Sequence, residues 1–112
     1  MINNKSIKRG SIVLCDLPIT ETSVQGNLRP AVVISNDIAN THSPVVSIVP
    51  LTGTRKKYLP VHTILESTAR RSTALCEQLT TISKSSIIKI LGIVQDDELR
   101  KIEQAVRIQL AI

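Results

Sequence analysis

The sequence predicts an α+β domain in which a strongly bent sheet packs against a helix. Short apolar runs alternate with turn formers through most of the chain, and the clearest helical pattern comes last. The chain is 42% hydrophobic but has no phenylalanine, no tryptophan and a single tyrosine, so its core must be built from valine, isoleucine and leucine. β-Branched side chains of this kind pack well on a pleated surface, which favours a sheet-rich core.

Each expected strand is an apolar run bounded by turn formers or by charged residues. A short helix is expected after Asn36-Asp37, and another over Lys84 to Ile87 with Ser83 as its cap. The expected strands cover residues 11–17, 30–35, 45–52, 61–66, 74–82 and 88–94.

The most strongly predicted helix begins at Asp96 and forms the end of the domain. Acidic residues in its first turn and Arg107 near its end suit the helix dipole. A spacing of three and four residues predicts one core-facing stripe. Its members are Leu99, Ile102, Val106 and Leu110.

Length, net charge and the lack of long apolar runs indicate the number of domains, the kind of partner and the location of the protein. With 112 residues the chain is expected to be one domain, residues 1–112. A formal net charge of +5 points to anionic partners. No apolar run approaches the ~20 residues of a membrane span, and the N-terminal residues lack the apolar block of a signal peptide. We therefore expect a cytoplasmic protein with no membrane association.

The two cysteines predict neither a metal site nor a disulfide. Cys15 and Cys76 each fall in an expected strand, with no second cysteine or nearby histidine at metal-ligand spacing. Reduced, buried thiols are the natural interpretation for a cytosolic protein. We expect no metal and no other cofactor.

The most informative segment is Gln25 to Asp37, which delivers Arg29 to the start of an apolar strand. Pro30 disfavours helical backbone at the residue before it and has no amide to donate to a ladder, so Arg29 is expected to be extended on a rigid element. Gly26 and Asn27 supply a turn just upstream. The alternative is an ordinary loop-to-strand junction with a solvated arginine.

Several motifs in this order and spacing resemble the MazF/PemK/Kid family of toxin endoribonucleases from bacterial toxin–antitoxin pairs, over nearly the whole chain. The motifs are Lys8-Arg9-Gly10, the strand ending at Asp16, the Gln-Gly-x-x-Arg-Pro signature, Ile34-Ser35-Asn36-Asp37, Pro50-Leu51-Thr52, Leu59-Pro60-Val61-His62 and Glu77-Gln78-Leu79.

The resemblance implies a small SH3-like barrel of strongly bent antiparallel sheet with a C-terminal helix, of the CcdB/MazF type. It also implies a homodimer whose protomers together form an RNA groove. The implied activity is metal-independent cleavage of single-stranded RNA at short sequence motifs, by attack of the ribose 2′-hydroxyl on the adjacent phosphate. A cognate antitoxin with an acidic flexible segment is expected to occupy the basic groove.

By motif, Arg29 corresponds to the family's catalytic arginine and Thr52 to its catalytic threonine. A guanidinium offers a planar fork of donors for phosphate oxygens, and a threonine hydroxyl can add one more. Neither is a good general base at neutral pH. His62 is the candidate base, because its unperturbed pKa of roughly 6.5 suits acid–base chemistry. The alternative is a hydrogen-bonded structural histidine turned into the sheet.

The segment Thr20 to Asn27 and the basic residues after Gly53 are expected to contact RNA. With only Tyr58 available for base stacking, recognition must rely on hydrogen bonds. The alternatives are a mobile solvent loop, solvated lysines and strand-end polar residues. The substrate-binding candidates are Ser23, Gln25, Gly26, Asn27, Arg55, Lys56, Lys57, Glu77 and Gln78, with Asp16 as a supporting residue.

The chain departs from the common family pattern at Val24, Thr80 and Ser83, where acidic, arginine and acidic residues are usual. His42 and the Arg70-Arg71 pair are expected to be surface residues. Two other functions stay open: a non-enzymatic toxin of the CcdB type that binds DNA gyrase, and an inert nucleic-acid-binding module. The mixed charges of the last helix make it a poor major-groove reader.

Overall fold

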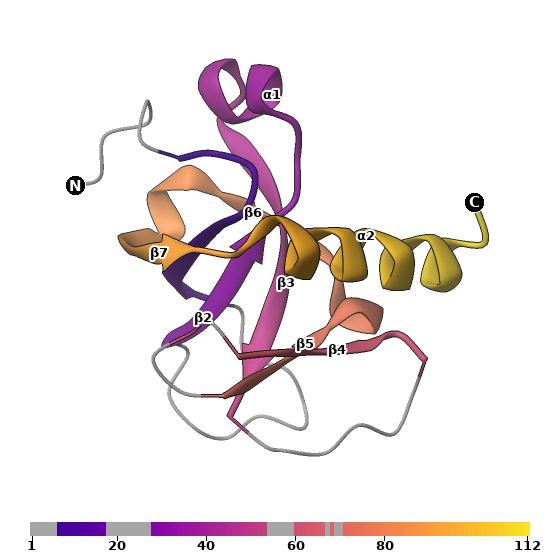
Figure 1. Ribbon diagram of the computed structural model, residues 1–112. Coiled ribbons are helices and arrows are strands. Elements are labelled where there is room, and N and C mark those ends of the chain that lie inside the picture. The colour runs from indigo at the N-terminus through magenta and orange to yellow at the C-terminus, as the bar shows by residue number, and fades with distance from the viewer. Residues whose placement is uncertain (1–6, 18–27, 54–59, 67, 69–70) are drawn as a thin grey trace.

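The computed structural model describes residues 7–17, 28–53, 60–66, 68 and 71–112. Strands occupy most of this part of the chain, and the longest helix comes last (Figure 1). In chain order the elements are β1 Ser11–Asp16, β2 Leu28–Val33, α1 Asp37–His42, β3 Val45–Thr52, β4 His62–Leu65, β5 Ser72–Leu75, the 3-10 turn η2 Cys76–Gln78, β6 Thr80–Ser83, the 3-10 turn η3 Lys84–Ser86, β7 Ile87–Ile93 and α2 Asp96–Leu110.

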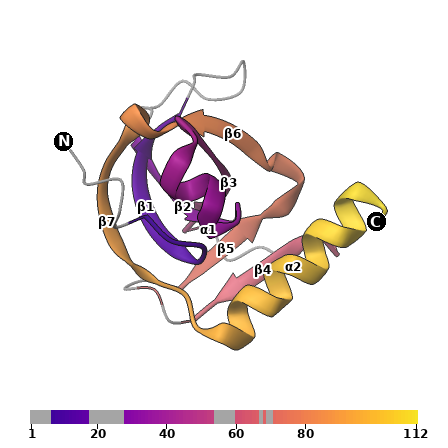
Figure 2. The ribbon, with the colours of Figure 1, turned by 90° about the horizontal axis from the view of Figure 1, so that it is seen from above.

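The described strands form one antiparallel sheet in the order β4-β5-β3-β2-β1-β7, and β6 also pairs with β3. β3 carries two partners on one edge, because its first half pairs with β6 and its last two residues pair with β5. This arrangement bends the sheet, and Figure 2 shows the strands curving round while α2 lies outside them along β4. The predicted α+β class with a strongly bent antiparallel sheet and a C-terminal helix is confirmed.

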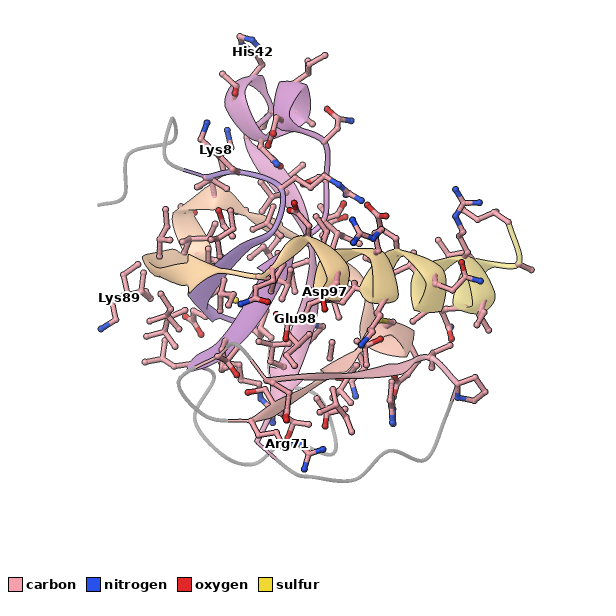
Figure 3. The ribbon with its side chains drawn as sticks, viewed as in Figure 1. Lys8, His42, Arg71, Lys89, Asp97 and Glu98 are labelled. Carbon is pink, nitrogen blue, oxygen red and sulfur yellow. The ribbon has the colours of Figure 1, made fainter. Side chains whose placement is uncertain are left out.

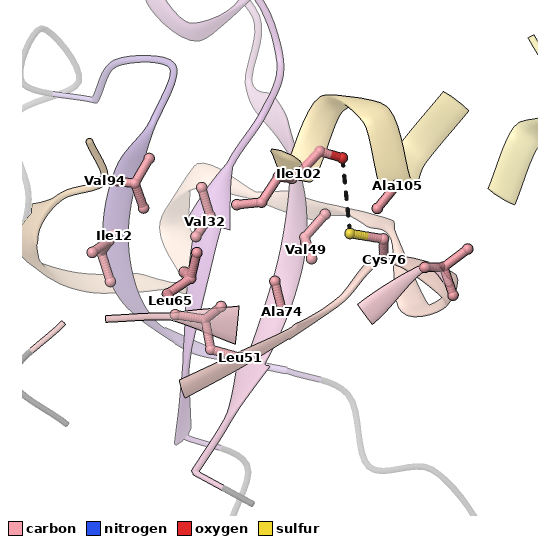
Figure 4. Packing of buried hydrophobic residues seen from close by; sticks show 11 residues of the cluster. Ile12, Val32, Val49, Leu51, Leu65, Ala74, Cys76, Val94, Ile102 and Ala105 are labelled. Carbon is pink, nitrogen blue, oxygen red and sulfur yellow. Dashed lines mark hydrogen bonds between the residues drawn. The ribbon is translucent and has the colours of Figure 1, made fainter. Parts of the chain in front are cut away.

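The sheet separates two buried clusters, because successive side chains of a strand point to opposite faces. The helix-side cluster lies against α2 (Figure 4) and comprises Ile12, Val32, Val49, Leu51, Val61, Leu65, Ala74, Cys76, Val94, Ile102 and Ala105. The barrel-side cluster, on the other face, comprises Ile7, Val13, Cys15, Ala31, Val33, Val46, Ile48, Ile82 and Ile87. Both clusters are almost entirely aliphatic, as the composition predicted.

The core stripe of α2 differs at one position from the prediction. Ile102 is fully buried, and Leu99 and Val106 pack against the helix-side cluster. Leu110 is 49% exposed, so its assignment to the core was wrong. The last turns of α2 project past the strands (Figure 1), and a residue on the correct helix face has no sheet beneath it there. Ala105 is buried instead.

The expected single strand over residues 74–82 was also wrong. β5 ends at Leu75 and β6 begins at Thr80, with the 3-10 turn η2 between them. The break follows from the pairing of β3, since β5 and β6 meet different parts of that strand and the chain must turn between them. Cys76 therefore lies in η2, where its Sγ donates to the carbonyl oxygen of Ile102 at 4.0 Å (Figure 4).

The remaining predicted elements agree with the structure to within two residues. β3 has the predicted bounds, and Ser83 caps η3 by accepting from the Ser85 N–H at 3.2 Å. β2 begins earlier than expected, which makes Arg29 its second residue.

Arg9 joins three elements near the end of β2. Its guanidinium donates to the carbonyl oxygen of Ile34 and to the carboxylate of Glu103 on α2. Its backbone N–H donates to Asp37 Oδ1 at 2.7 Å. This backbone bond is the main reason that the pKa of Asp37 lies below its ordinary value. The start of α1 is thereby linked to the chain that leads into β1.

Candidate active site

Arg29 and Thr52 come together through the pairing of β2 with β3. The register pairs Ala31 with Pro50 and Val33 with Ile48. Continued by two residues, the same register places Arg29 directly opposite Thr52. Residues opposite each other in an antiparallel pair have Cβ atoms roughly 4.5–5.5 Å apart and share a face. Since the last pair of the ladder is Ala31 with Pro50, we infer from this count that the two predicted catalytic residues are neighbours.

Both side chains lie on the face of the barrel-side cluster. Arg29 alternates in step with Ala31 and Val33, and Thr52 alternates in step with Ile48, which are members of that cluster. Both Arg29 and Thr52 are partly exposed, unlike these apolar residues further along the strands. They lie where β2 begins and β3 ends, at the opposite end of the molecule from α1 (Figure 1). The backbone of the pair is therefore held in the sheet, while its side chains can reach solvent.

Cys15 supports the backbone of Arg29 from β1. The two residues are directly paired, and the Cys15 thiol donates to the carbonyl oxygen of Arg29 at 3.4 Å. Cys15 is fully buried, and burial raises the pKa of its thiol to about 11. The thiol therefore stays protonated and unreactive at neutral pH, in a supporting rather than a nucleophilic role.

Thr73 is a neighbour of Thr52 that the sequence did not single out. β3 and β5 pair Thr52 with Thr73, and Thr73 is 1% exposed. β5 begins at Ser72, two residues before the start of the strand predicted over residues 74–82, so Thr73 lay outside that prediction. The sequence does not show which residue of β3 Thr73 faces, because register depends on long-range pairing.

Asp16 does not share the face of Arg29. The register pairs Asp16 with Leu28, one step out of phase with the pairing of Cys15 and Arg29. Alternation therefore directs Asp16 to the other face of β1. Asp16 and Arg29 therefore leave the sheet on opposite faces.

His62 lies away from the Arg29–Thr52 pair. Thr52 pairs with Thr73, which pairs with Ile64, and His62 is two residues further along β4. With strands about 4.8 Å apart and a rise of about 3.3 Å per residue, the Cα atoms of His62 and Thr52 are about 12 Å apart.

The imidazole of His62 has a partner of its own. Its Nε2 lies 3.0 Å from Glu77 Oε2, and its side chain is 8% exposed. Glu77 Oε1 is buried and has no hydrogen-bond partner among the described residues. His62 and Glu77 thus form a pair that ties β4 to η2.

Glu77 and Gln78 lie along β3 rather than at its end. β5 meets β3 at Leu51 and Thr52, and β6 meets it up to Ile48, so η2 lies beside the residues between them. Gln78 is exposed and Glu77 is partly exposed. The residues of β3 beside η2 are therefore Val49 and Pro50, which precede Thr52 by three and two positions.

The other predicted substrate contacts fall outside the described residues. They are Ser23, Gln25, Gly26, Asn27, Arg55, Lys56 and Lys57.

Arg71 and His42 are surface residues, as expected. Arg71 is exposed, and its Nε lies 2.8 Å from Glu66 Oε1. In Figure 3, Arg71 lies at the lower end of the molecule and His42 at the upper end, on α1. Among the described residues, no three His, Cys, Asp or Glu side chains form a group that could hold a metal ion.

Comparison with known proteins decides the family. Residues 8–110 match the family model described as PemK-like, MazF-like toxin of type II toxin-antitoxin system. The chain belongs to the PemK/MazF toxin family. A curated relative, Endoribonuclease MazF of Staphylococcus saprophyticus, is 32% identical over 111 residues, which cover 95% of this chain and 92% of the relative.

Two solved structures share the fold of this chain. An endoribonuclease from a mycobacterial species has a TM-score of 0.80 and 25% identity, over 96% of this chain and 93% of that chain. MazF of Deinococcus radiodurans has a TM-score of 0.81 and 20% identity, over 95% and 97% of the two chains. The comparisons give no support to the gyrase-binding alternative. Within the described part of the chain, no helix has the length and apolar character needed to cross a membrane.

Proposed function

We propose that this PemK/MazF-family chain is a metal-independent endoribonuclease toxin that cleaves single-stranded RNA at short sequence motifs and so inhibits translation. The observation that carries the proposal is the placement of Arg29 opposite Thr52 on one face of a rigid sheet. It agrees with the family of the chain and with the endoribonuclease named as its relative.

Arg29 supplies the positive charge that the reaction needs. Its guanidinium carries charge at all physiological pH values and offers parallel N–H donors to the two non-bridging phosphate oxygens. As the ribose O2′ attacks phosphorus, negative charge grows on these oxygens, and donors fixed in advance stabilise it.

Thr52 adds a hydroxyl donor on the next strand. In the proposed reaction the bond from O2′ to phosphorus forms while the bond from phosphorus to O5′ breaks. The attacking 2′-hydroxyl loses its proton and the departing O5′ gains one, so the products are a 2′,3′-cyclic phosphate and a 5′-hydroxyl end. Arg29 and Thr52 grip the same phosphate from adjacent strands, so the sheet holds their relative positions. Glu77 and Gln78 on η2, with residues 23–27 and 55–57, are proposed to contact the flanking nucleotides.

A cognate antitoxin is proposed as the regulatory partner in the cytoplasm. The family is described as the toxin of a toxin-antitoxin system, and a mycobacterial structural neighbour, 24% identical with a TM-score of 0.81, was solved in complex with its antitoxin. The net charge of +5 favours an acidic antitoxin segment that competes with RNA.

A homodimer is proposed for the active form. Large apolar side chains are exposed on β7 and at the end of α2: Ile88, Leu91, Ile93, Ile108, Leu110 and Ile112. These side chains lie in two places, on β7 and at the end of α2 (Figure 2), and a second copy that covers either of them would remove it from water. Sedimentation equilibrium is expected to give twice the chain mass, and the mass of one chain at every concentration would contradict the dimer.

Cleavage of a long single-stranded RNA in excess EDTA tests the proposed activity, with the cut ends sequenced. Wild type is expected to give discrete cuts that reveal its motif. Arg29→Ala and Thr52→Ala are each expected to cut at least about 10²-fold more slowly. Arg100→Ala, an exposed arginine on α2, serves as the matched control and is expected to cut like wild type. Folded wild type that leaves the RNA intact would overturn the proposal.

A further inference from the structure

A row of small and polar side chains crosses the sheet at the proposed site. The pairings run from Cys15 on β1 to Arg29 on β2, and from Thr52 on β3 to Thr73 on β5. The extended register of β2 and β3 joins the two halves. Arg29 and Thr52 are thus flanked by Cys15 and Thr73, which are both buried.

The hydroxyl of Thr73 lies on the same face as that of Thr52. The preceding pair in the ladder, Leu51 with Ala74, belongs to the helix-side cluster. Alternation therefore directs Thr52 and Thr73 together to the opposite face. At 1% exposure, Thr73 cannot contact a substrate itself. Any influence of Thr73 on the reaction must pass through a neighbour.

We propose that Thr73 is a positioning residue, which holds the Thr52 hydroxyl in the orientation that donates to the phosphate. A threonine hydroxyl has one proton to donate and two lone pairs to accept with. When Thr73 donates to Thr52 Oγ1, the Thr52 proton is left to point at the substrate. Cross-strand threonine pairs hydrogen bond at this separation. The inference rests on the proposed function, because it concerns the same reaction.

Steady-state kinetics on a short RNA containing the mapped motif separate this role from simple filling of the sheet. Thr73→Val keeps the shape and β-branching but removes the hydroxyl, and Thr73→Ser keeps the hydroxyl. Thr73→Val is expected to lower kcat about tenfold, less than the ~10²-fold or more that loss of a whole transition-state donor costs. KM is expected to stay unchanged, since phosphate binding by Arg29 is intact. Thr73→Ser is expected to retain kcat.

Thr63→Val is the matched control for loss of a buried hydroxyl. Thr63 lies on β4, is 7% exposed and donates from Oγ1 to the carbonyl oxygen of Lys101 on α2 at 3.4 Å. It lies on the helix side of the sheet, away from Arg29 and Thr52. Thr63→Val is expected to lower stability without changing kcat. Thermal melts of every variant identify the folded ones.

A weaker donor provides a second test if Thr73→Val does not fold. Thr73→Cys is close to serine in shape but offers only a weak S–H donor. Its kcat is expected to lie between those of Thr73→Ser and Thr73→Val, again with KM unchanged. A full wild-type kcat in a folded Thr73→Val or in Thr73→Cys, or loss of kcat in Thr73→Ser, overturns the role of Thr73. Wild type that cuts no RNA overturns the proposed function and this inference together.

Discussion

The surroundings of His62 differ from those expected of a catalytic histidine. Histidine is the usual acid–base residue near neutral pH, yet here the ring is 8% exposed and paired with Glu77, about 12 Å from Thr52 by strand geometry. The pair satisfies one oxygen of Glu77, whose other oxygen is buried without a partner among the described residues. We therefore expect His62 to have a structural role.

Substitution of His62 distinguishes this role from general base catalysis. His62→Gln keeps an N–H donor for Glu77 but removes the ability to take up a proton. If the role of His62 is structural, this variant is expected to retain kcat. His62→Ala leaves the carboxylate unpaired and is expected to lower the free energy of unfolding by about 1–3 kcal/mol. Chemical denaturation and cleavage rates provide the two readouts. A loss of kcat of about 10²-fold or more in both variants would identify a general base instead.

The two cysteines are expected to be inert in the folded protein. Both are fully buried, and burial raises the pKa of Cys15 to about 11 and that of Cys76 to about 12. At about pH 8 a free thiol is partly ionised, but these remain protonated and shielded. A chromogenic disulfide reagent is expected to modify both thiols in guanidinium and neither in native protein. Rapid modification of native protein would contradict this expectation.

At the scale of elements, apolar runs predicted strands well where the whole run forms a single strand. β3 has the bounds that its apolar run indicated, because both of its faces are buried. The run over residues 74–82 has similar composition, but it serves two different parts of β3 and must break. Sequence periodicity contains local information only, so it cannot show this division.

In helix α2, sequence periodicity shows which face is buried but not how far along the helix that burial extends. Periodicity identified the buried face, but the point where the sheet ends decides that Leu110 is exposed. Ile102→Ala is expected to destabilise the fold by about 2–5 kcal/mol, because it opens a cavity in the helix-side cluster. Gln104→Ala, an exposed neighbour on the same helix, is expected to change stability by less than about 0.5 kcal/mol. Equal effects on urea unfolding would contradict the observed packing.

The start of α1 is expected to be sensitive to acid. The Arg9 N–H donates to Asp37 and lowers the pKa of that carboxyl below the ordinary value of 3.8. A depressed folded pKa stabilises the fold above the unfolded pKa, and this stabilisation is lost as the pH falls through the folded value. Wild type is therefore expected to be more stable than Asp37→Asn at neutral pH, with the difference fading in acid. A difference in unfolding free energy that is constant with pH would contradict this mechanism.

At the scale of the whole molecule, the sheet converts separate sequence motifs into one site. Arg29 and Thr52 are distant in sequence and were linked there only by resemblance to a family. The register of β2 and β3 supplies the physical link: counted two residues past its last pair, Ala31 with Pro50, it aligns the two side chains on one face. Other pairings place the remaining candidates: β3 with β5 sets Thr73 opposite Thr52, β1 with β2 sets Asp16 opposite Leu28, and β4 with β5 sets His62 opposite Leu75. Residue types could be predicted from sequence, but their partners could not, because the pairing of distant strands decides them.

The central claim is that this arginine–threonine pair cleaves RNA by attack of the ribose 2′-hydroxyl. The most direct test compares two short RNAs in excess EDTA, identical except for a 2′-deoxy sugar at the mapped cut site. Wild type is expected to cut the all-ribose strand and leave a 2′,3′-cyclic phosphate, and to leave the 2′-deoxy strand intact. Arg29→Ala is expected to cut neither at a comparable rate. Cleavage of the 2′-deoxy strand at a similar rate, or undiminished cleavage by Arg29→Ala, would contradict the claim.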